Sequence, residues 1–505
     1  MGLADKKKIW SRAKTDPRIG ITLCAALALL LGLTAWWSGM SGNTAIMAGL
    51  AAFMAVCWVT EVVPIPVTSL FPLALFPLFG VAPVDEVAAS YGKPVIYLFL
   101  GGFLLALGLQ RSGVHRRIAL WIVDNAGSQP SRLILGFMLA SAGLSMWISN
   151  TATVLVMLPI ALAVLEEAKQ SGVSPPALSK FGVALMLGIA YAADIGGMAT
   201  PVGTPPNLVL LQLYSELVPD KPPLGFGQWM IMGLPLSAIF LSCGWLLLTK
   251  VVFRFPGESL FGETDVIRSA RESLGTIRRD EWITVIVFMV AAFLWMTRAK
   301  LQFGALTIPG WQSLLGLELM GDASVAIAAA AVLFMIPSTD HPGETLLTWK
   351  QATDIPWGLL LLFGGGFALA KGFELSGLSE SIGEALTAFK DVHPIVLVAT
   401  VCLCITFLTE VTSNTATTSL ILPILAEASR AMGIDPLLLM IPATLSASCA
   451  FMMPVASPTQ AIVFGSGYVS IRQMVRAGIW FNLLGVFLVT TIFMLVAKPL
   501  FGIDW

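Results

Sequence analysis

The sequence predicts an all-α polytopic membrane protein made of two related halves. Of its 505 residues, 56% are hydrophobic and only 12% are charged, with a mean hydropathy of +0.84. No soluble domain needs that much apolar surface. Apolar runs long enough to cross a bilayer also recur along the chain. Finally, glycine-rich and polar motifs occur twice in the same order, which indicates an internal repeat.

The remaining composition excludes several classes of protein. A net charge of −1 gives no support to nucleic-acid binding. The six cysteines lie in apolar segments without paired spacing, so we expect buried hydrophobic side chains, not disulfides or a zinc site. The three histidines are equally scattered. The basic start is followed by an apolar run without a clear small-residue cleavage site, so no cleavable signal peptide is expected.

The apolar runs predict about 11 transmembrane helices. They lie near residues 20–38, 45–63, 68–80, 95–122, 181–213, 229–253, 282–298, 322–337, 355–373, 436–467 and 474–498. Two of them, 181–213 and 436–467, contain Gly and Pro clusters and are expected to be broken helices, because proline removes a backbone donor.

Two further apolar segments, 132–165 and 394–427, are interrupted by polar residues. The interruptions are Ser149-Asn150-Thr151 and Ser413-Asn414-Thr415. A segment that cannot hold one continuous helix at this depth is typical of a re-entrant hairpin with the polar turn at its tip.

The two polar motifs share one register with a glycine motif. Ser413 follows Ser149 by 264 residues (413 − 149), and Phe363 follows Phe99 by the same 264 (363 − 99), where each Phe opens a glycine-rich string. The broken helices match at 253 residues (458 − 205). If each half crosses the membrane an odd number of times, the halves are inverted relative to one another, which is the arrangement we expect.

Hydroxyl and amide groups at this depth suit the joint binding of a cation and an anion. Sodium prefers oxygen ligands such as hydroxyls, amide oxygens and free carbonyls. A carboxylate needs donors, which hydroxyls, Asn amides and the starts of half-helices supply. Such residues can also bond neighbouring helices to one another. Their occurrence twice, in register beside broken helices, favours a binding site.

These residues resemble the divalent anion/sodium symporter family, solute carrier 13. The resemblance covers roughly residues 45–500 and rests on the two Ser-Asn-Thr motifs, on residues 58–68, and on Gly203-Thr204-Pro205-Pro206-Asn207. It implies a homodimeric elevator transporter with a scaffold domain and a moving transport domain. That family couples sodium to di- or tricarboxylates, or in some members to sulfate.

The resemblance also implies site residues. The first sodium site would use Ser145, Ser149, Asn150 and Gly203, and the second would use Thr409, Thr412, Asn414 and Ala456. The substrate carboxylates would meet Asn150, Thr151, Thr204, Ser413, Asn414, Thr415, Ser457 and Pro458. Many members carry Thr, and then Pro-Asn, where this chain has Ser457 and Thr459-Gln460. This difference leaves the sodium coupling and the substrate class as expected, but it bears on which carboxylate the protein would prefer.

We expect a cytoplasmic N-terminus at 1–19 and a cytoplasmic linker at 254–281, because both are rich in Lys or Arg. Scaffold helices would occupy 20–92 and 282–354. The first repeat, 93–253, would hold the hairpin 132–165 and the broken helix 181–213. The second repeat, 355–505, would hold the hairpin 394–427 and the broken helix 436–467.

Three acids and the glycine strings have alternative interpretations. Glu410 and Asp194 are each either a proton relay or a supporting, cavity-facing group. Glu61 is expected to cap or bridge scaffold helices. The glycines at 101–102 and 364–366 lack the Lys-Ser/Thr of a phosphate loop, which favours close helix packing.

The expected function is sodium-coupled secondary active transport of small dicarboxylates, of the succinate, malate and fumarate class, by an elevator mechanism. A sodium-independent dicarboxylate exchanger, or a tricarboxylate or sulfate carrier of the same family, are the alternatives. No catalytic motif argues for an enzyme, and midplane hairpins suit a carrier better than a channel. Sodium would be the coupling ion and a small carboxylate the substrate. The protein would be a homodimer among the lipids of the cytoplasmic (inner) membrane, without nucleic-acid partners.

Overall fold

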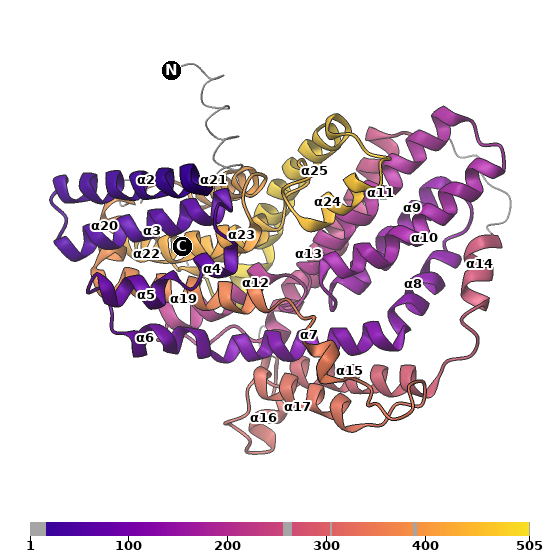
Figure 1. Cartoon of the computed structure of the whole chain (residues 1–505), viewed down its shortest axis with the longest axis horizontal. Coiled ribbons are helices and arrows are strands. Elements are labelled where there is room, and N and C mark those ends of the chain that lie inside the picture. The colour runs from indigo at the N-terminus through magenta and orange to yellow at the C-terminus, as the bar shows by residue number, and fades with distance from the viewer. Residues whose placement is uncertain (1–16, 256–264, 304–305, 387–390, 504–505) are drawn as a thin grey trace.

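The computed structural model describes residues 17–255, 265–303, 306–386 and 391–503 (Figure 1). Nearly all of the expected cytoplasmic N-terminus at 1–19, and part of the linker at 254–281, lie outside these residues. The described chain is helical apart from short stretches. The one ribbon in the described part pairs β1 (Leu301–Phe303) with antiparallel β2 (Leu306–Ile308).

The elements follow in chain order. Those before the linker are α2 (Pro17–Trp37), α3 (Gly42–Thr60), α4 (Ile65–Thr68), α5 (Phe71–Leu78), α6 (Val84–Ala89), η1 (Ser90–Gly92), α7 (Pro94–Ser112), α8 (Val114–Asp124), α9 (Pro130–Ser145), α10 (Asn150–Gln170), α11 (Pro175–Gly197), α12 (Pro205–Leu217), α13 (Phe226–Leu246) and the π-helical η2 (Leu247–Val252). Those from the linker onward are α14 (Asp265–Glu272), α15 (Arg279–Thr297), α16 (Trp311–Leu314), α17 (Asp322–Met335), α18 (Trp349–Ala352), α19 (Trp357–Ser376), α20 (Leu378–Leu386), α21 (Pro394–Thr409), α22 (Asn414–Met432), α23 (Leu437–Ala447), α24 (Pro458–Gly465), α25 (Ile471–Ile492), the π-helical η4 (Phe493–Ala497) and α26 (Lys498–Phe501).

Nine helical stretches in the described part of the chain are long and apolar enough to cross a membrane. Four further apolar helical stretches, 65–78, 322–335, 394–409 and 437–447, are shorter than that. The all-α, multi-pass fold class is confirmed. About 11 spans were expected from the length of the apolar segments. Two of those segments, 68–80 and 322–337, correspond to helical stretches that are too short to count among the nine.

The apolar run 95–122 was expected to be one segment, and that expectation is wrong. Helix α7 ends at Ser112, and Gly113 follows in the left-handed conformation with φ +83°. Glycine adopts this conformation without the steric penalty of a Cβ, so the chain can turn there. Arg116 and Arg117 then give α8 a polar face. The second helix is therefore amphipathic and separate from α7.

Both expected hairpins contain a helix, a short turn and a second helix. Helix α9 ends at Ser145 and α10 begins at Asn150, while α21 ends at Thr409 and α22 begins at Asn414. The two Gly/Pro segments are interrupted likewise. Helix α11 stops at Gly197 before α12 starts at Pro205, and α23 stops at Ala447 before α24 starts at Pro458. The polar motifs therefore lie where helices end and begin.

In Figure 1 the N-terminal helices α2 and α3 lie at one end of the elongated chain, beside α20 and α22. Helices α8, α9 and α10 form the opposite end, with α14 against α8. Helix α11 is buried along almost its whole length and packs against α9. Helix α11, which ends at the first break, is thus among the most enclosed elements of the described chain.

The prediction of close helix packing at the glycine strings is confirmed. A Cβ on Gly101 would lie 2.5 Å from the Cβ of Ala326 in α17. A Cβ on Gly365 would lie 2.5 Å from the carbonyl oxygen of Ser69, and one on Gly366 would lie 2.8 Å from the Cβ of Ser419. Small residues let these backbones approach closely, as membrane helices often require.

Candidate functional site

The polar motifs of both halves meet in one cavity of about 680 Å³. Its wall contains all eight residues expected to contact substrate: Asn150, Thr151, Thr204, Ser413, Asn414, Thr415, Ser457 and Pro458. It also contains Ser149, Gly203, Thr412 and Ala456 of the expected cation ligands. Ser145 and Thr409 are fully buried behind the wall. A size of this order is usual for sites that hold a small molecule.

Four helices begin at this cavity. The first residues of α10, α12, α22 and α24 line it, with Ser149, Thr204, Ser413 and Ser457 as the residues that precede each helix. The first turn of a helix has backbone N–H groups without intrahelical partners and carries partial positive charge. Two of these helices, α10 and α12, come from the part of the chain before the linker, and two, α22 and α24, from the part after it, so both parts turn their positive helix ends toward the same space.

The same side-chain bond fixes the Asn of each hairpin. Ser145 Oγ donates to Asn150 Oδ1 at 2.5 Å, and Thr409 Oγ1 donates to Asn414 Oδ1 at 2.6 Å. In each pair the hydroxyl comes from the last residue of the first helix, and the amide from the first residue of the second helix. The two halves therefore orient their amide oxygens in the same way.

The surroundings of Asn150 suit a small cation. A Cβ built on Gly197 would lie 2.8 Å from Asn150 Oδ1 and 3.1 Å from the carbonyl oxygen of Gly203. One built on Gly203 would lie 3.0 Å from the carbonyl oxygen of Ser145. These oxygens surround a space that stays open because positions 197 and 203 are glycines, which have no Cβ. Asn207 Oδ1 is also fully buried and has no hydrogen-bond partner among the described residues. Oxygen ligands of this kind are what a hard cation such as sodium prefers.

The second site has a related but different set. Thr409 Oγ1 also approaches the carbonyl oxygen of Ala447 at 3.1 Å, where α23 ends. The neighbouring Ser448 Oγ is buried and has no hydrogen-bond partner in the described chain. Thr412 Oγ1 donates to the carbonyl oxygen of Leu408 and contacts Thr417 Oγ1 at 2.6 Å, so its hydroxyl is engaged inside the hairpin. The oxygens around Asn414 therefore fit a cation as well.

Asp194 lies in the cavity wall beside Asn150, although it is almost completely buried. Its Oδ1 accepts from Asn150 Nδ2 at 3.1 Å, and its Oδ2 accepts from Thr459 Oγ1 at 2.9 Å and from Gln460 Nε2 at 3.2 Å. One carboxylate thus joins the hairpin of the first half to the broken helix of the second. The resemblance assigned no ligand role to Asp194, and the signal in the sequence was an acid inside the apolar run 181–213.

Glu410 has a different environment from Asp194. It accepts from the backbone N–H groups of Phe451, Met452 and Met453 at 2.8 to 3.1 Å, and from Asn482 Nδ2 at 2.7 Å. The carboxylate therefore holds the chain where α23 has ended. It does not line the cavity, and this geometry favours the supporting role over a proton relay.

Other helices also contribute to the wall of this cavity. Val59, Glu61, Ile65, Phe99, Phe103 and Leu359 line it. Glu61 stands at the end of α3 with φ +52°, so it closes that helix in a left-handed turn. The cavity is therefore lined by the hairpins and broken helices together with α3, α4, α7 and α19.

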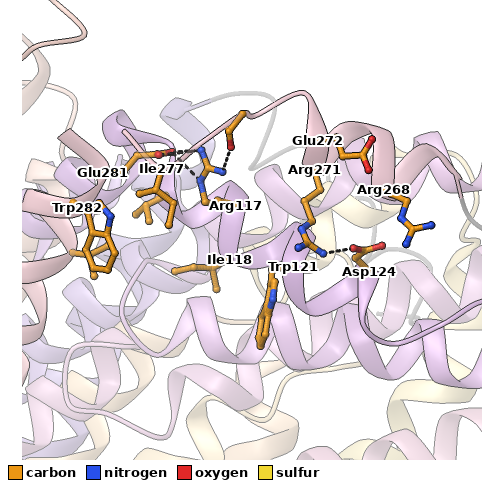
Figure 2. A pocket seen from close by; sticks show the side chains of 13 residues that line it. Arg117, Ile118, Trp121, Asp124, Arg268, Arg271, Glu272, Ile277, Glu281 and Trp282 are labelled. Carbon is orange, nitrogen blue, oxygen red and sulfur yellow. Dashed lines mark hydrogen bonds and ion pairs between the residues drawn. The ribbon is translucent and has the colours of Figure 1, made fainter. Parts of the chain in front are cut away.

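A second cavity, of about 710 Å³, lies among α8, α14 and α15. Figure 2 shows Arg117 directed at Glu281 and Arg271 directed at Asp124, with nitrogen-to-oxygen distances of 3.0 and 2.5 Å. Its wall holds as many acids as arginines. Paired charges of this kind join α8 to the linker, and they leave little excess positive charge for a dianion.

Comparison with known proteins agrees with this arrangement. The family described as "Sodium:sulfate symporter transmembrane region" matches residues 19–503. The sodium-dependent dicarboxylate transporter SdcS of Staphylococcus saprophyticus is 40% identical over 490 residues, which cover 96% of this chain and 92% of that protein. SdcS of Staphylococcus aureus (strain MRSA252) is 38% identical over 503 residues, which cover 99% of this chain and 94% of that protein.

A solved structure shares the fold alone. The Alcanivorax borkumensis YdaH transporter superposes with a TM-score of 0.57 at 13% identity, covering 82% of this chain and 88% of that one. The family match spans almost the whole chain, and the motifs that it contains are those that line the cavity. The chain therefore belongs to the sodium:sulfate symporter family, the divalent anion/sodium symporters that its paired motifs resemble.

Proposed function

We propose that this protein is a secondary active transporter that couples sodium to the movement of a small dicarboxylate of the succinate, malate and fumarate class. The observation that carries the proposal is the cavity itself. Four helix starts and two bonded Asn side chains converge there. Among the described residues of its wall there is no Lys, Arg or His.

An anion in such a cavity needs cations. Removing a carboxylate from water without compensation costs several kcal/mol even after relaxation. The partial positive charge at each helix start offsets up to ~2 kcal/mol of this desolvation cost in favourable geometry. Asp194 and Glu61 add negative charge to the wall. Bound sodium would neutralise the substrate and order the hairpin tips, and the coupling would be reciprocal.

The relatives support the same choice of substrate and ion. Both SdcS proteins are named as sodium-dependent dicarboxylate transporters, and their similarity covers nearly all of this chain.

Under this proposal the first cation lies among Ser145, Ser149, Asn150 and Gly203, and the second among Thr409, Thr412, Asn414 and Ala456. The substrate contacts Thr151, Thr204, Thr415 and Pro458 together with both Asn side chains, Ser413 and Ser457.

We further propose an elevator movement between inverted halves. In support of it, the cavity is lined both by the hairpins and broken helices and by α3, α4, α7 and α19, so it would lie where the two groups of elements move past one another. The N-terminus and the linker 254–281 would face the cytoplasm, in an inner-membrane homodimer. The domain limits given above would then separate scaffold from transport domain.

The test is calorimetric titration of the purified protein with succinate, in sodium buffer and in choline buffer. Binding is expected only in sodium. Equal affinity in both buffers would contradict symport and favour a sodium-independent exchanger.

Two further measurements complete the test. A thermal-shift screen of di- and tricarboxylates and sulfate identifies the preferred anion. Counterflow of labelled succinate in liposomes distinguishes a carrier from a channel or an enzyme.

A further inference from the structure

The cavity among α8, α14 and α15 contains an arginine that no acid pairs with in the described part of the chain. The two ion pairs described above engage the other arginines of its wall. Arg268, on α14, is exposed and has no ion pair among the described residues. Figure 2 shows Arg268 and Arg271 directed toward the part of the cavity that holds Asp124, whereas Glu272 is directed away from it. One free positive charge therefore faces this space.

The rest of the wall is apolar and exposed. Trp121 of α8 is 56% exposed, and Trp282 of α15 is 54% exposed. Ile118 and Ile277 are exposed beside them. A phosphate ion alone would leave most of a cavity of about 710 Å³ unfilled and these side chains in water. Clustered exposed apolar groups of this kind mark a binding surface for another apolar group. The cavity therefore suits a ligand with an anionic head and an apolar tail.

The exposed face of α15 continues from this cavity along the helix. Trp282 is followed on the same face by Ile286, Met289 and Phe293, which are between 53% and 63% exposed. Spacings of four, three and four residues keep these side chains on one stripe of a helix. Helix α15 is long and apolar enough to cross a membrane, so this stripe would face acyl chains. The arginines thus stand at the end of a lipid-facing stripe.

Helix α8 has the form of a helix that lies in the membrane interface. Ala119, Leu120 and Val123 are buried on one side of it, whereas Ile118 and Trp121 are exposed on the other. Amphipathic helices with basic residues and exposed tryptophan lie at the level of lipid headgroups. Basic pockets beside membrane helices at this level bind anionic headgroups. The position of the cavity therefore agrees with its chemistry.

We propose that this cavity binds an anionic phospholipid, with the phosphodiester beside Arg268 and Arg271 and an acyl chain along the exposed stripe of α15. A phosphodiester carries one negative charge, which the one free arginine matches, and guanidinium groups bind phosphate oxygens in pairs. The site goes beyond the proposed transport function, because none of its described lining residues lines the substrate cavity. Since α8 packs against α9, a lipid held there would contact the helix that leads into the first hairpin.

Lipid titration of the delipidated full chain in detergent tests this site, with the thermal unfolding midpoint as the readout. Phosphatidylglycerol is the anionic probe, and phosphatidylcholine with the same acyl chains is the neutral comparison. The wild type is expected to reach half of its maximal shift at an about fivefold lower concentration of phosphatidylglycerol than of phosphatidylcholine, the effect of one basic residue at an anionic lipid surface.

Arg268→Gln should remove this preference and still fold, because Arg268 has no ion pair among the described residues. As a matched control, Arg132→Gln removes an exposed arginine near the start of α9, outside the cavity. That variant should keep the fivefold preference. Equal losses in the two variants would show an effect of overall surface charge and would overturn the site.

Two further arms test the apolar part of the ligand. Trp121→Ala should weaken phosphatidylglycerol binding about fivefold, because an exposed ring that the lipid would cover is lost. Trp480→Ala removes a ring of α25 that is 54% exposed and lies outside the cavity, and it should leave binding unchanged. Glycerophosphoglycerol, the same headgroup without acyl chains, should produce no shift at the concentration at which phosphatidylglycerol saturates the protein.

The remaining outcomes would contradict the proposal. Equal responses of the wild type to both lipids, or an unchanged preference in Arg268→Gln, would overturn the anionic site. A shift with glycerophosphoglycerol as large as with the lipid would identify a soluble phosphodiester as the ligand and overturn the lipid assignment. The titrations contain neither sodium nor succinate, so their failure leaves the proposed transport function standing.

Discussion

The ring of Phe99 stacks on the ring of Phe363, with centroids 4.2 Å apart and planes 26° from parallel. These residues occupy equivalent positions in the two halves, 264 residues apart (363 − 99). Equivalent residues of two repeats can touch one another where the axis that relates the repeats passes between them. The contact joins α7 to α19 and supports the proposal of paired, inverted halves.

This pair should be coupled energetically. Phe99→Ala and Phe363→Ala are each expected to lower the free energy of unfolding by about 3–5 kcal/mol, because both rings are buried. In the double variant the losses should differ from additivity by about 0.5–1.5 kcal/mol. Phe53, which stacks on Phe71 instead, is the control. Phe53→Ala should be additive with Phe99→Ala, and additivity for the Phe99 and Phe363 pair would contradict a direct coupling.

Asn150→Ala and Asn414→Ala should each abolish succinate uptake while the protein stays folded. Each change removes the amide oxygen that Ser145 or Thr409 now orients. Losing one hydrogen bond to a charged group costs about 1.5–3 kcal/mol, and loss of sodium adds to that. Asn125→Ala, at the exposed end of α8, is the control. Uptake at the wild-type rate with normal size-exclusion profiles would show that the site is elsewhere.

Gly197→Ala should remove the stabilisation of the protein by sodium at the first site. The new methyl group would lie 2.8 Å from Asn150 Oδ1 and occupy the space between the ligand oxygens. Gly143→Ala is a matched control, because a Cβ there meets nothing within 4 Å. Thermal unfolding with increasing sodium measures both variants. An equal sodium response in Gly197→Ala and the wild type would refute the placement of this cation.

Glu410→Gln should destabilise the second broken helix. The carboxylate accepts three backbone N–H groups, whereas a glutamine turns its own NH₂ group toward some of those donors. The expected loss in unfolding free energy is about 1.5–3 kcal/mol, together with weaker apparent sodium affinity. Glu374→Gln removes an exposed pair with Lys371 and should change stability by less than about 1 kcal/mol. Equal effects of the two variants on chemical denaturation would argue against the role assigned to Glu410.

Ser457→Thr should change substrate preference without ending transport. The hydroxyl that precedes α24 is kept, and one methyl group is added in the cavity wall. A methyl in a tight pocket changes discrimination by roughly 1–3 kcal/mol. Competition by four-, five- and six-carbon di- and tricarboxylates against labelled succinate measures the change. An identical competition profile would place Ser457 outside the contact with substrate.

Local chemistry in the sequence predicts that two of the apolar segments are broken helices. Proline and glycine interrupt the i to i−4 bonding pattern, so the break after Gly197 could be expected from composition. The second break begins already after Ala447, several residues before Pro454, and the proline cluster does not predict that position. Apolar length predicted the multi-pass fold in the same way. The sequence does not reveal the turn within the run 95–122, because a single Gly113 inside apolar sequence does not show that its φ is positive.

From its sequence alone, this chain could be recognised as a multi-pass helical membrane protein with paired polar motifs in one register near helix breaks. Which of those residues meet depends on how distant helices pack. Asp194 and Thr459 are 265 positions apart, and their hydrogen bonds depend on how α11 packs against α24. The stacking of Phe99 on Phe363 depends in the same way on α7 and α19. Helix breaks follow from local backbone chemistry, whereas contacts between distant helices follow from the packing of the whole chain.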